Sequence, residues 1–129
     1  MSDKFIIELI TPDQTILKSE ATEVTIPSYE GQMGILKNHI PLITFLRPGL
    51  ILIKGQELTK YYVEEGTVEF SNNNLLILTS TAKDLKKFDN RSIIELLKVA
   101  EKKMKDNNLN DKEKYIASYK IDTLKELSQ

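Results

Sequence analysis

The chain has 129 residues, of which 40% are hydrophobic and 29% are charged, and its net charge is -1. This composition suits a packed core in one domain, or in a small domain with an appendage, and gives no reason to expect nucleic acid or an acidic membrane surface as a partner. The absence of cysteine excludes disulfides, thiol catalysis and thiolate metal sites. We expect no signal peptide and no membrane-spanning helix, because the apolar runs are short and are interrupted by charges such as Glu8.

The region up to about residue 82 has the pattern of short strands separated by turns. Residues 5–11 alternate, with Phe5, Ile7 and Leu9 on one side, and this period is typical of a half-buried strand. Turns are expected at 11–14, 31–34, 48–49, 55–56 and 72–74. Short strands with turns every ~8–12 residues predict an antiparallel sandwich or barrel, in which Gly66 is a candidate β-bulge.

The rest of the chain has the pattern of two helices joined by a short connection. Asp89 or Asn90 can cap the first helix, and apolar residues then recur at helical spacing. These apolar residues are Ile93, Leu96, Leu97, Ala100 and Met104. Asn110 and Glu113 resemble a capping box for a second helix that ends at about Leu127. Helices of this length are marginal alone in water, so we expect an antiparallel hairpin that packs on itself, on the β region or on a partner.

Glycine, proline and charge divide the chain into two unlike parts. All five glycines and all four prolines lie at or before Gly66. Residues 1–82 contain 6 Lys/Arg and 10 Asp/Glu, a net charge of -4, whereas residues 83–129 contain 12 and 9, a net charge of +3. We therefore predict an N-terminal β domain over residues 1–84 and a C-terminal helical domain over residues 88–129.

The stretch from residue 29 to residue 49 is the place where composition alone would suggest an active site. It holds three glycines, two prolines and His39, the only histidine. A nucleophilic triad needs a base beside a Ser or Thr, and a zinc site needs several convergent ligands, so a lone histidine meets neither requirement. Phosphate-binding glycine motifs are absent, and the adjacent acids Glu64 and Glu65 would point to opposite faces of a strand, one inward or bulged and one solvated. We predict no catalytic residue, no metal site and no cofactor site, and hence a non-catalytic interaction module.

In and beyond this stretch, several short motifs occur in the order seen in a known family. The motifs are Pro27, Glu30-Gly31, Gly34-Ile35-Leu36, His39, Pro41-Leu42, Leu46-x-Pro48-Gly49 and Val63-x-x-Gly66-x-Val68-Glu69. Their ordered combination resembles the signature of the epsilon subunit of F-type (proton-translocating) ATP synthases. The resemblance extends over residues 3–82 without a gap, and the helical region matches in length and layout.

The resemblance implies a fold and a role. The fold is a β-sandwich of about ten antiparallel strands followed by an α-helical hairpin. The role is that of a non-catalytic central-stalk subunit of the rotor, which binds the gamma subunit and the ring of c subunits and couples proton translocation to ATP synthesis. In many bacteria the C-terminal helices also reach the alpha–beta hexamer and restrain ATP hydrolysis. The implied location is peripheral, at the cytoplasmic face of the bacterial plasma membrane, with membrane association only through the complex.

The resemblance also implies two groups of contact residues. Those toward the c ring are Tyr29, Glu30, Gly31, Gln32 and Met33. Those toward the gamma subunit are Thr11, His39 and Thr44. A large side chain at a loop tip suits a contact, and glycine lets a backbone approach a partner closely. For the glycines and prolines of this stretch, turn geometry alone is the alternative explanation.

Some members of the family bind ATP in the hairpin through an Ile-Asp pair followed two residues later by Arg-Ala, with arginines in the second helix. Here Asp89 is present, but Arg91 comes one position early and Ser92 replaces the alanine. The second helix has lysines and no arginine, and lysine lacks the planar fork that binds phosphate through two parallel hydrogen bonds. We therefore predict no tight ATP binding, and a compact hairpin whose inhibition of ATP hydrolysis is weak or absent.

An alternative function is a stand-alone β-sandwich that binds carbohydrate or peptide and carries a helical tail. Carbohydrate sites need exposed aromatic platforms. The chain has no tryptophan, and the adjacent Tyr61 and Tyr62 put only one ring on each face of a strand. A carboxylate-based hydrolase, the enzyme alternative, needs two acids across a cleft, which the sequence does not show.

Overall fold

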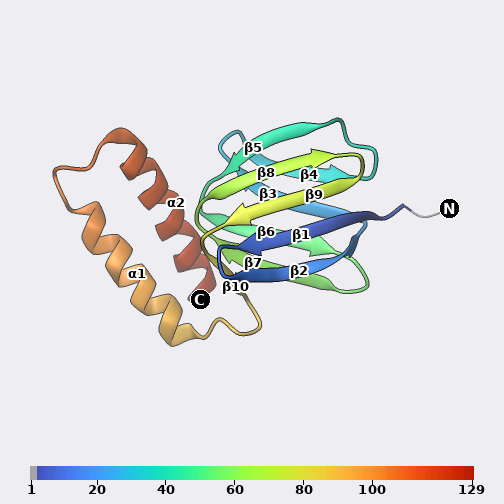
Figure 1. The fold of residues 1–129 in the computed structure, drawn as a ribbon. Coiled ribbons are helices and arrows are strands. Elements are labelled where there is room, and N and C mark those ends of the chain that lie inside the picture. The colour runs from blue at the N-terminus through green and yellow to red at the C-terminus, as the bar shows by residue number, and fades with distance from the viewer. Residues whose placement is uncertain (1–2) are drawn as a thin grey trace.

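The computed structural model describes residues 3–129 and contains ten β-strands followed by two α-helices (Figure 1). The strands are β1 (Phe5–Thr11), β2 (Gln14–Ala21), β3 (Glu23–Ser28), β4 (Gly31–Leu36), β5 (Leu42–Leu46), β6 (Gly49–Lys54), β7 (Leu58–Val63), β8 (Gly66–Ser71), β9 (Asn74–Thr79) and β10 (Ala82–Asp84). The helices are α1 (Asn90–Met104) and α2 (Asp111–Leu127). This architecture confirms the predicted sandwich followed by a helical hairpin.

The strands form two layers that face each other. Hydrogen bonding runs in the order β10-β7-β6-β3-β5-β8-β9-β1-β2, with β4 paired to β3. The ladder between β3 and β5 consists of one pair, Ser28 with Leu46, and here the sheet passes from one layer into the other. The back layer therefore contains β4, β3, β6, β7 and β10, and the front layer contains β5, β8, β9, β1 and β2 (Figure 1). Among the strands of residues 3–129, paired neighbours are antiparallel except β1 and β9, which are parallel.

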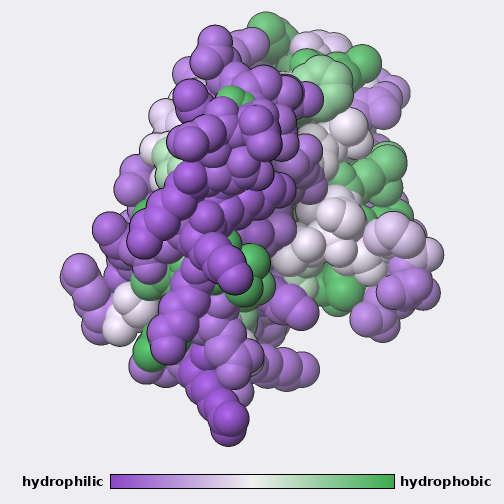
Figure 2. Space-filling view, turned by 90° about the vertical axis from the view of Figure 1, so that its left-hand side faces the viewer, coloured by the Kyte–Doolittle hydropathy of each residue, from purple (hydrophilic) through white to green (hydrophobic). Residues whose placement is uncertain are grey.

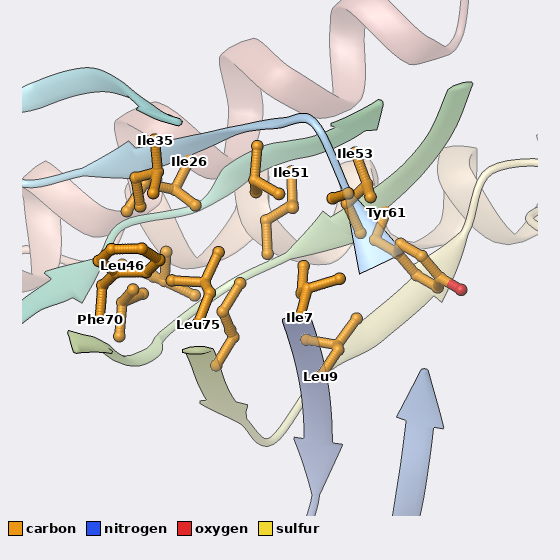
Figure 3. Close-up of a cluster of buried hydrophobic side chains, with 14 of the residues drawn as sticks. Ile7, Leu9, Ile26, Ile35, Leu46, Ile51, Ile53, Tyr61, Phe70 and Leu75 are labelled. Carbon is orange, nitrogen blue, oxygen red and sulfur yellow. The ribbon is translucent and has the colours of Figure 1, made fainter. Parts of the chain in front are cut away.

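The core lies between the two layers and is built from alternate residues of the strands. Phe5, Ile7 and Leu9 of β1 are buried, as their alternation predicts. They pack with inward side chains from both layers (Figure 3), among them Ile26, Ile35, Leu46, Ile51, Phe70 and Leu75. The sandwich thus has a continuous apolar core of its own, to which the helices do not contribute.

The turn between β8 and β9 confirms the prediction made from its asparagines. Asn72 and Asn73 form a two-residue hairpin loop with φ of 51° and 58°, a left-handed conformation that asparagine tolerates. This turn is joined to the loop after β4, because the Asn38 N–H donates to Asn73 Oδ1 at 2.7 Å and Asn73 Nδ2 donates to Asn38 Oδ1 at 3.1 Å. Two loops of the front and back layers are therefore held together at this end of the sandwich.

The expected bulge at Gly66 is wrong. Gly66 begins β8 and pairs in regular register with Leu46 and Thr79, and an irregular step falls in the β1–β2 ladder instead, where Ile16 of β2 is skipped. A side chain at position 66 would collide with the carbonyl oxygen of Leu78. Close packing between neighbouring strands, rather than an extra residue, explains the glycine.

Both helices begin at the caps that the sequence predicts. The Asp89 carboxylate accepts a hydrogen bond from the Ser92 N–H at 2.7 Å, and Asn110 with Glu113 forms a reciprocal capping box. These side chains satisfy backbone N–H groups that have no partner within the helix. No helix in residues 3–129 is long and apolar enough to cross a membrane.

The hairpin packs against one end of the sandwich through a second, smaller apolar cluster. Its buried residues are Tyr62 of β7, Ile93 of α1 and Leu124 of α2. Partly buried side chains surround them, namely Leu50, Leu85, Phe88, Leu96, Leu97 and Leu127. Helix α2 lies nearer to the sandwich than α1 (Figure 1). Tyr61, the neighbour of Tyr62, points into the sandwich core, so two adjacent residues of β7 contribute to different cores.

Candidate partner-binding surfaces

The outer surface of the front layer carries apolar side chains that the chain itself leaves uncovered. Ile43 is 75% exposed, Phe45 58% and Leu78 43%. Phe45 lies opposite Thr67, Thr67 opposite Leu78, and Leu78 beside Ile10, so a row of side chains crosses four strands. We call this surface the apolar face, defined by Ile10, Ile43, Phe45, Leu76 and Leu78. In Figure 2 apolar groups gather to the right of the largely hydrophilic hairpin, on the side of the front layer. Exposed apolar patches of this kind mark interaction sites.

Two residues predicted to face the gamma subunit lie toward opposite ends of the apolar face. A hollow of about 560 Å³ at one end is lined by Thr11 and Pro12 together with Phe45 and Leu78. His39 precedes β5 at the other end, where its ring centroid lies 6.0 Å from that of Phe70. The structure thus relates both residues to one surface without bringing them into contact.

Thr44, the third residue predicted for this partner, lies beneath the surface. It stands between Ile43 and Phe45 in β5, but its side chain is only 8% exposed. The alternation of the strand turns Leu42, Thr44 and Leu46 toward the interior and their neighbours outward. The exposed residues of this strand are therefore Ile43 and Phe45, which sequence reasoning missed. Because the segment is apolar on both faces, alternation alone does not say which face is outside.

The turn between β3 and β4 and the first residues of β4 contain the residues predicted to face the c ring. Tyr29, Glu30 and Gln32 are exposed, and Gly31 has φ of 116°, a backbone conformation that favours glycine. Met33 is half-buried and packs against the sandwich core. The turn can therefore present the side chains of Tyr29, Glu30 and Gln32 to a partner.

Tyr29 also contacts helix α2, which the sequence did not predict. Its ring stacks on that of Tyr115, with centroids 5.4 Å apart and 14° between the planes, and the Tyr115 hydroxyl donates to the Tyr29 carbonyl oxygen at 3.4 Å. Tyr115 meets the ring of Tyr119 at 4.8 Å, and the guanidinium carbon of Arg47 lies 3.8 Å from the Tyr119 ring centroid. Arg47 Nε also donates to the Ser28 carbonyl oxygen at 2.9 Å. Aromatic stacking and a cation–π contact therefore join α2 to the sandwich.

A partly buried ion pair fixes the middle of α2 to the sandwich. Lys120 Nζ lies 3.1 Å from Glu64 Oε2, and each side chain is 23% exposed. The Tyr62 hydroxyl donates to the same oxygen at 3.0 Å. Burial, and after it the charge of Glu64, raises the pKa of Tyr62, so the phenol keeps the proton that it donates. Glu64 is thus partly buried and Glu65 is exposed, but both lie in the connection between β7 and β8, so the expected alternation along a strand is not the cause.

Asp89 and Arg91, the residues that partly match the ATP-binding motif, both contact residues of α1. Hydrogen bonds from Ser92 lower the pKa of the Asp89 carboxyl group. Arg91 Nε lies 3.6 Å from Glu95 Oε1, one turn further along the helix, in an exposed pair. A cleft of about 750 Å³ lies between α1 and the strands β2 and β10, but neither Asp89 nor Arg91 lines it. In this conformation Asp89 caps the N-terminus of α1, and Arg91 forms an ion pair in its first turns.

The described residues contain no cluster of side chains that could bind a metal ion: among residues 3–129, no three His, Asp or Glu side chains converge in a way that could hold one. His39 Nδ1 lies 2.7 Å from the carbonyl oxygen of Ile40, its chain neighbour, and the other ring contact is with Phe70. Tyr61 and Tyr62 are both buried, so they form no aromatic platform on the surface.

Comparison with known proteins identifies the family to which this chain belongs. Residues 4–84 match the family model described as ATP synthase, delta/epsilon chain, β-sandwich domain. This chain belongs to that family. An ATP synthase epsilon chain of Pelagibacter ubique (strain HTCC1062) is 47% identical over 132 residues, which cover 99% of this chain and 100% of the relative. The resemblance expected from the ordered motifs is therefore confirmed.

Solved structures share the fold of this delta/epsilon-family chain over both the sandwich and the hairpin. A chain in the cryo-EM structure of the Euglena gracilis mitochondrial ATP synthase (OSCP/F1/c-ring) matches with a TM-score of 0.80 at 21% identity, over 100% of this chain and 84% of that chain. A chain in the central stalk/c-ring structure of the Tetrahymena thermophila enzyme matches with a TM-score of 0.66 at 17% identity, over 96% of each chain. At this identity the likeness establishes the fold.

Proposed function

We propose that this chain is a non-catalytic central-stalk subunit of a proton-translocating ATP synthase, where it turns with the rotor and couples proton translocation to ATP synthesis. The apolar face is the observation that carries the proposal, because the folded sandwich leaves Ile43, Phe45 and Leu78 uncovered. Covering such side chains against a neighbour is favourable by about 1.5–3 kcal/mol for each one fully buried. Membership of the delta/epsilon family supports this assignment.

We assign the apolar face to the gamma subunit. Thr11 borders one end of the face and His39 lies toward the other. The side chain of Thr44 is buried on the inner side of β5, below the face. Ile43 and Phe45 would make the contact itself. A stiff β-sandwich suits this task, since a rotor part that transmits torque needs a rigid body beneath its contact surface.

We assign the turn at residues 29–33 to the c ring. Glu30 and Gln32 are exposed and polar, which suits the polar loops of a membrane-embedded ring. Tyr29 would contact this partner as well as α2, where its ring stacks on Tyr115. The chain would then lie at the cytoplasmic face of the bacterial plasma membrane and reach the membrane through the complex.

We assign a compact resting position to the hairpin. The stack of Tyr29 on Tyr115 and the pair of Glu64 with Lys120 support it, because a hairpin that extends toward the alpha–beta hexamer must first give up both contacts. Its inhibition of ATP hydrolysis would then be weak. Deleting residues 88–129 in the assembled enzyme should leave the ATPase rate nearly unchanged, and strong activation would contradict this part of the proposal.

Co-purification tests the assignment of the apolar face. The full chain should co-purify with gamma and the alpha–beta hexamer, and Phe45→Asp should abolish this because it places a charge in the contact. Leu58→Asp is the matched control. Leu58 is also a large hydrophobic residue at the surface, 46% exposed, but it belongs to β7 in the back layer. Purification of the unchanged chain without gamma, or equal losses in both variants, would refute the assignment.

A further inference from the structure

Glu69 interrupts the apolar face. It lies in β8 directly opposite Ile43 of β5 on one side and Leu76 of β9 on the other. Side chains opposite each other in antiparallel strands stand on the same face with Cβ atoms about 5 Å apart. Glu69 and Ile43 are both exposed, so a carboxylate stands at the outer surface between apolar side chains.

Within the described part of the chain, the Glu69 carboxylate has no hydrogen-bond or ion-pair partner. The next positions on the same side of β8 are Thr67 and Ser71, which carry hydroxyls and no charge. Glu8 stands further along the same row, but Lys18 of β2 lies directly opposite it. In the row that runs from Ile43 across Glu69 and Leu76 to Glu8, Glu69 thus differs from Glu8, because both of its cross-strand neighbours are apolar.

Water stabilises the Glu69 carboxylate only while the face is open. A partner that covers the face removes this water, and an unpaired carboxylate in the contact then opposes binding more strongly than burial of the neighbouring side chains favours it. A purely apolar partner surface would be rejected at this point. The step rests on the proposed function, under which the gamma subunit covers this face.

We propose that the gamma subunit inserts a positively charged side chain between Ile43 and Leu76, where it pairs with Glu69. An arginine guanidinium fits this place best, because it is planar, weakly hydrated and able to donate two parallel hydrogen bonds to a carboxylate. The pair fixes the register of gamma on the sandwich and discriminates against apolar surfaces that lack the cation.

The test compares binding of the full chain and its variants to an alpha–beta–gamma assembly that lacks this subunit, at about 50 to 500 mM NaCl. Glu69→Gln removes the charge and keeps the shape, whereas Glu69→Leu makes the face wholly apolar. Glu57→Gln is the matched control, the same change at an exposed carboxylate in the turn between β6 and β7. Thermal melting of each variant confirms that the exposed substitutions leave the fold intact.

We expect Glu69→Gln and Glu69→Leu each to weaken binding about tenfold or more at low salt and to flatten its salt dependence, while Glu57→Gln binds like the unchanged chain. Binding by Glu69→Leu that equals or exceeds that of the unchanged chain would overturn the pairing and leave Glu69 as a group that only keeps the open face soluble. Failure of the unchanged chain to bind would overturn the proposed function together with the pairing, and so the two failures are distinguishable.

Discussion

A single substitution tests how α2 is held on the sandwich. Lys120 Nζ lies 3.1 Å from Glu64 Oε2, and the Tyr62 hydroxyl donates to the same oxygen at 3.0 Å. Lys120→Met keeps an apolar stem of similar length in place and removes the charge. Glu64 is then left partly buried, with Tyr62 as its donor and no cation beside it.

The expected size of this effect follows from the exposure of the pair. Exposed ion pairs contribute about 0.2–1 kcal/mol, whereas removing one partner of a buried pair costs about 3–5 kcal/mol. Because both side chains are 23% exposed, the substitution should cost between these limits, about 1–2 kcal/mol. The undocked hairpin should then become about five to thirty times more populated.

Hydrogen exchange of the α2 amides measures this population, because amides exchange through local opening. Exchange across α2 should accelerate by the same factor in Lys120→Met, while the amides of β1 keep their rates. Lys114→Met, a matched change at an exposed lysine of α2, should have little effect. The double variant Glu64→Gln with Lys120→Met should recover part of the loss, since no unpaired charge remains. Equal α2 exchange in Lys120→Met and Lys114→Met would refute the reasoning.

Three further substitutions probe the sandwich core, a helix cap and a buried phenol. Ile7→Ala should lower the free energy of unfolding in urea by about 2–5 kcal/mol, and a loss far below this range would contradict the full burial of Ile7. Asp89→Ala should reduce helicity by circular dichroism more than Arg91→Ala, which breaks only an exposed pair, and equal losses would contradict the cap assignment. Because folding raises the pKa of Tyr62, the folded chain keeps a proton that the unfolded chain loses near pH 10, so the free energy of unfolding should fall as the pH rises above about 10. Tyr62→Phe should make that fall shallower in urea titrations at several pH values, and an unchanged slope would count against this account.

Local patterns predicted the features that have local causes. Alternate residues of a strand share a face, and so Phe5, Ile7 and Leu9 indicate the buried side of β1 before any partner strand is known. Asp89 and Asn110 begin helices because each side chain accepts a hydrogen bond from an N–H three residues further on. The fold class follows from such signals together with the glycine, proline and asparagine turns.

Contacts between distant segments were not predictable from one sequence. The hydroxyl of Tyr115 reaches the carbonyl oxygen of Tyr29, 86 positions away, and no local period relates the two. The outward direction of Ile43 and Phe45 has a different cause, because β5 is apolar on both faces and its burial depends on which side the back layer covers. The candidate partner surfaces could therefore be predicted as segments, whereas the side chains that they present required the three-dimensional arrangement.

The two apolar clusters differ in size, and this difference determines how the molecule opens. Sixteen of the described residues are buried in the sandwich core, whereas the cluster beneath the hairpin has three, Tyr62, Ile93 and Leu124. Since hydrophobic stabilisation scales with the buried apolar area, the hairpin should detach at a smaller free energy than the sandwich unfolds. Detachment leaves the apolar face intact, because that face belongs to the front layer and the hairpin does not cover it (Figures 1 and 2).

Detachment of the hairpin would free the side chain of Tyr29, a residue that we also assign to the contact with the c ring. Its ring stacks on Tyr115 of α2 and belongs to the turn assigned to the c ring, whereas in residues 3–129 the aromatic residue of the apolar face, Phe45, makes no such ring contact with α2. An aromatic pair contributes about 0.5–1.5 kcal/mol beyond its buried area, so Tyr29→Ala should accelerate α2 exchange about two- to twelvefold. The same variant should bind the alpha–beta–gamma assembly as tightly as the unchanged chain, since the apolar face is untouched. Weaker binding to gamma would show that the position of the hairpin is coupled to the front layer, and the separation of the two surfaces would then be wrong.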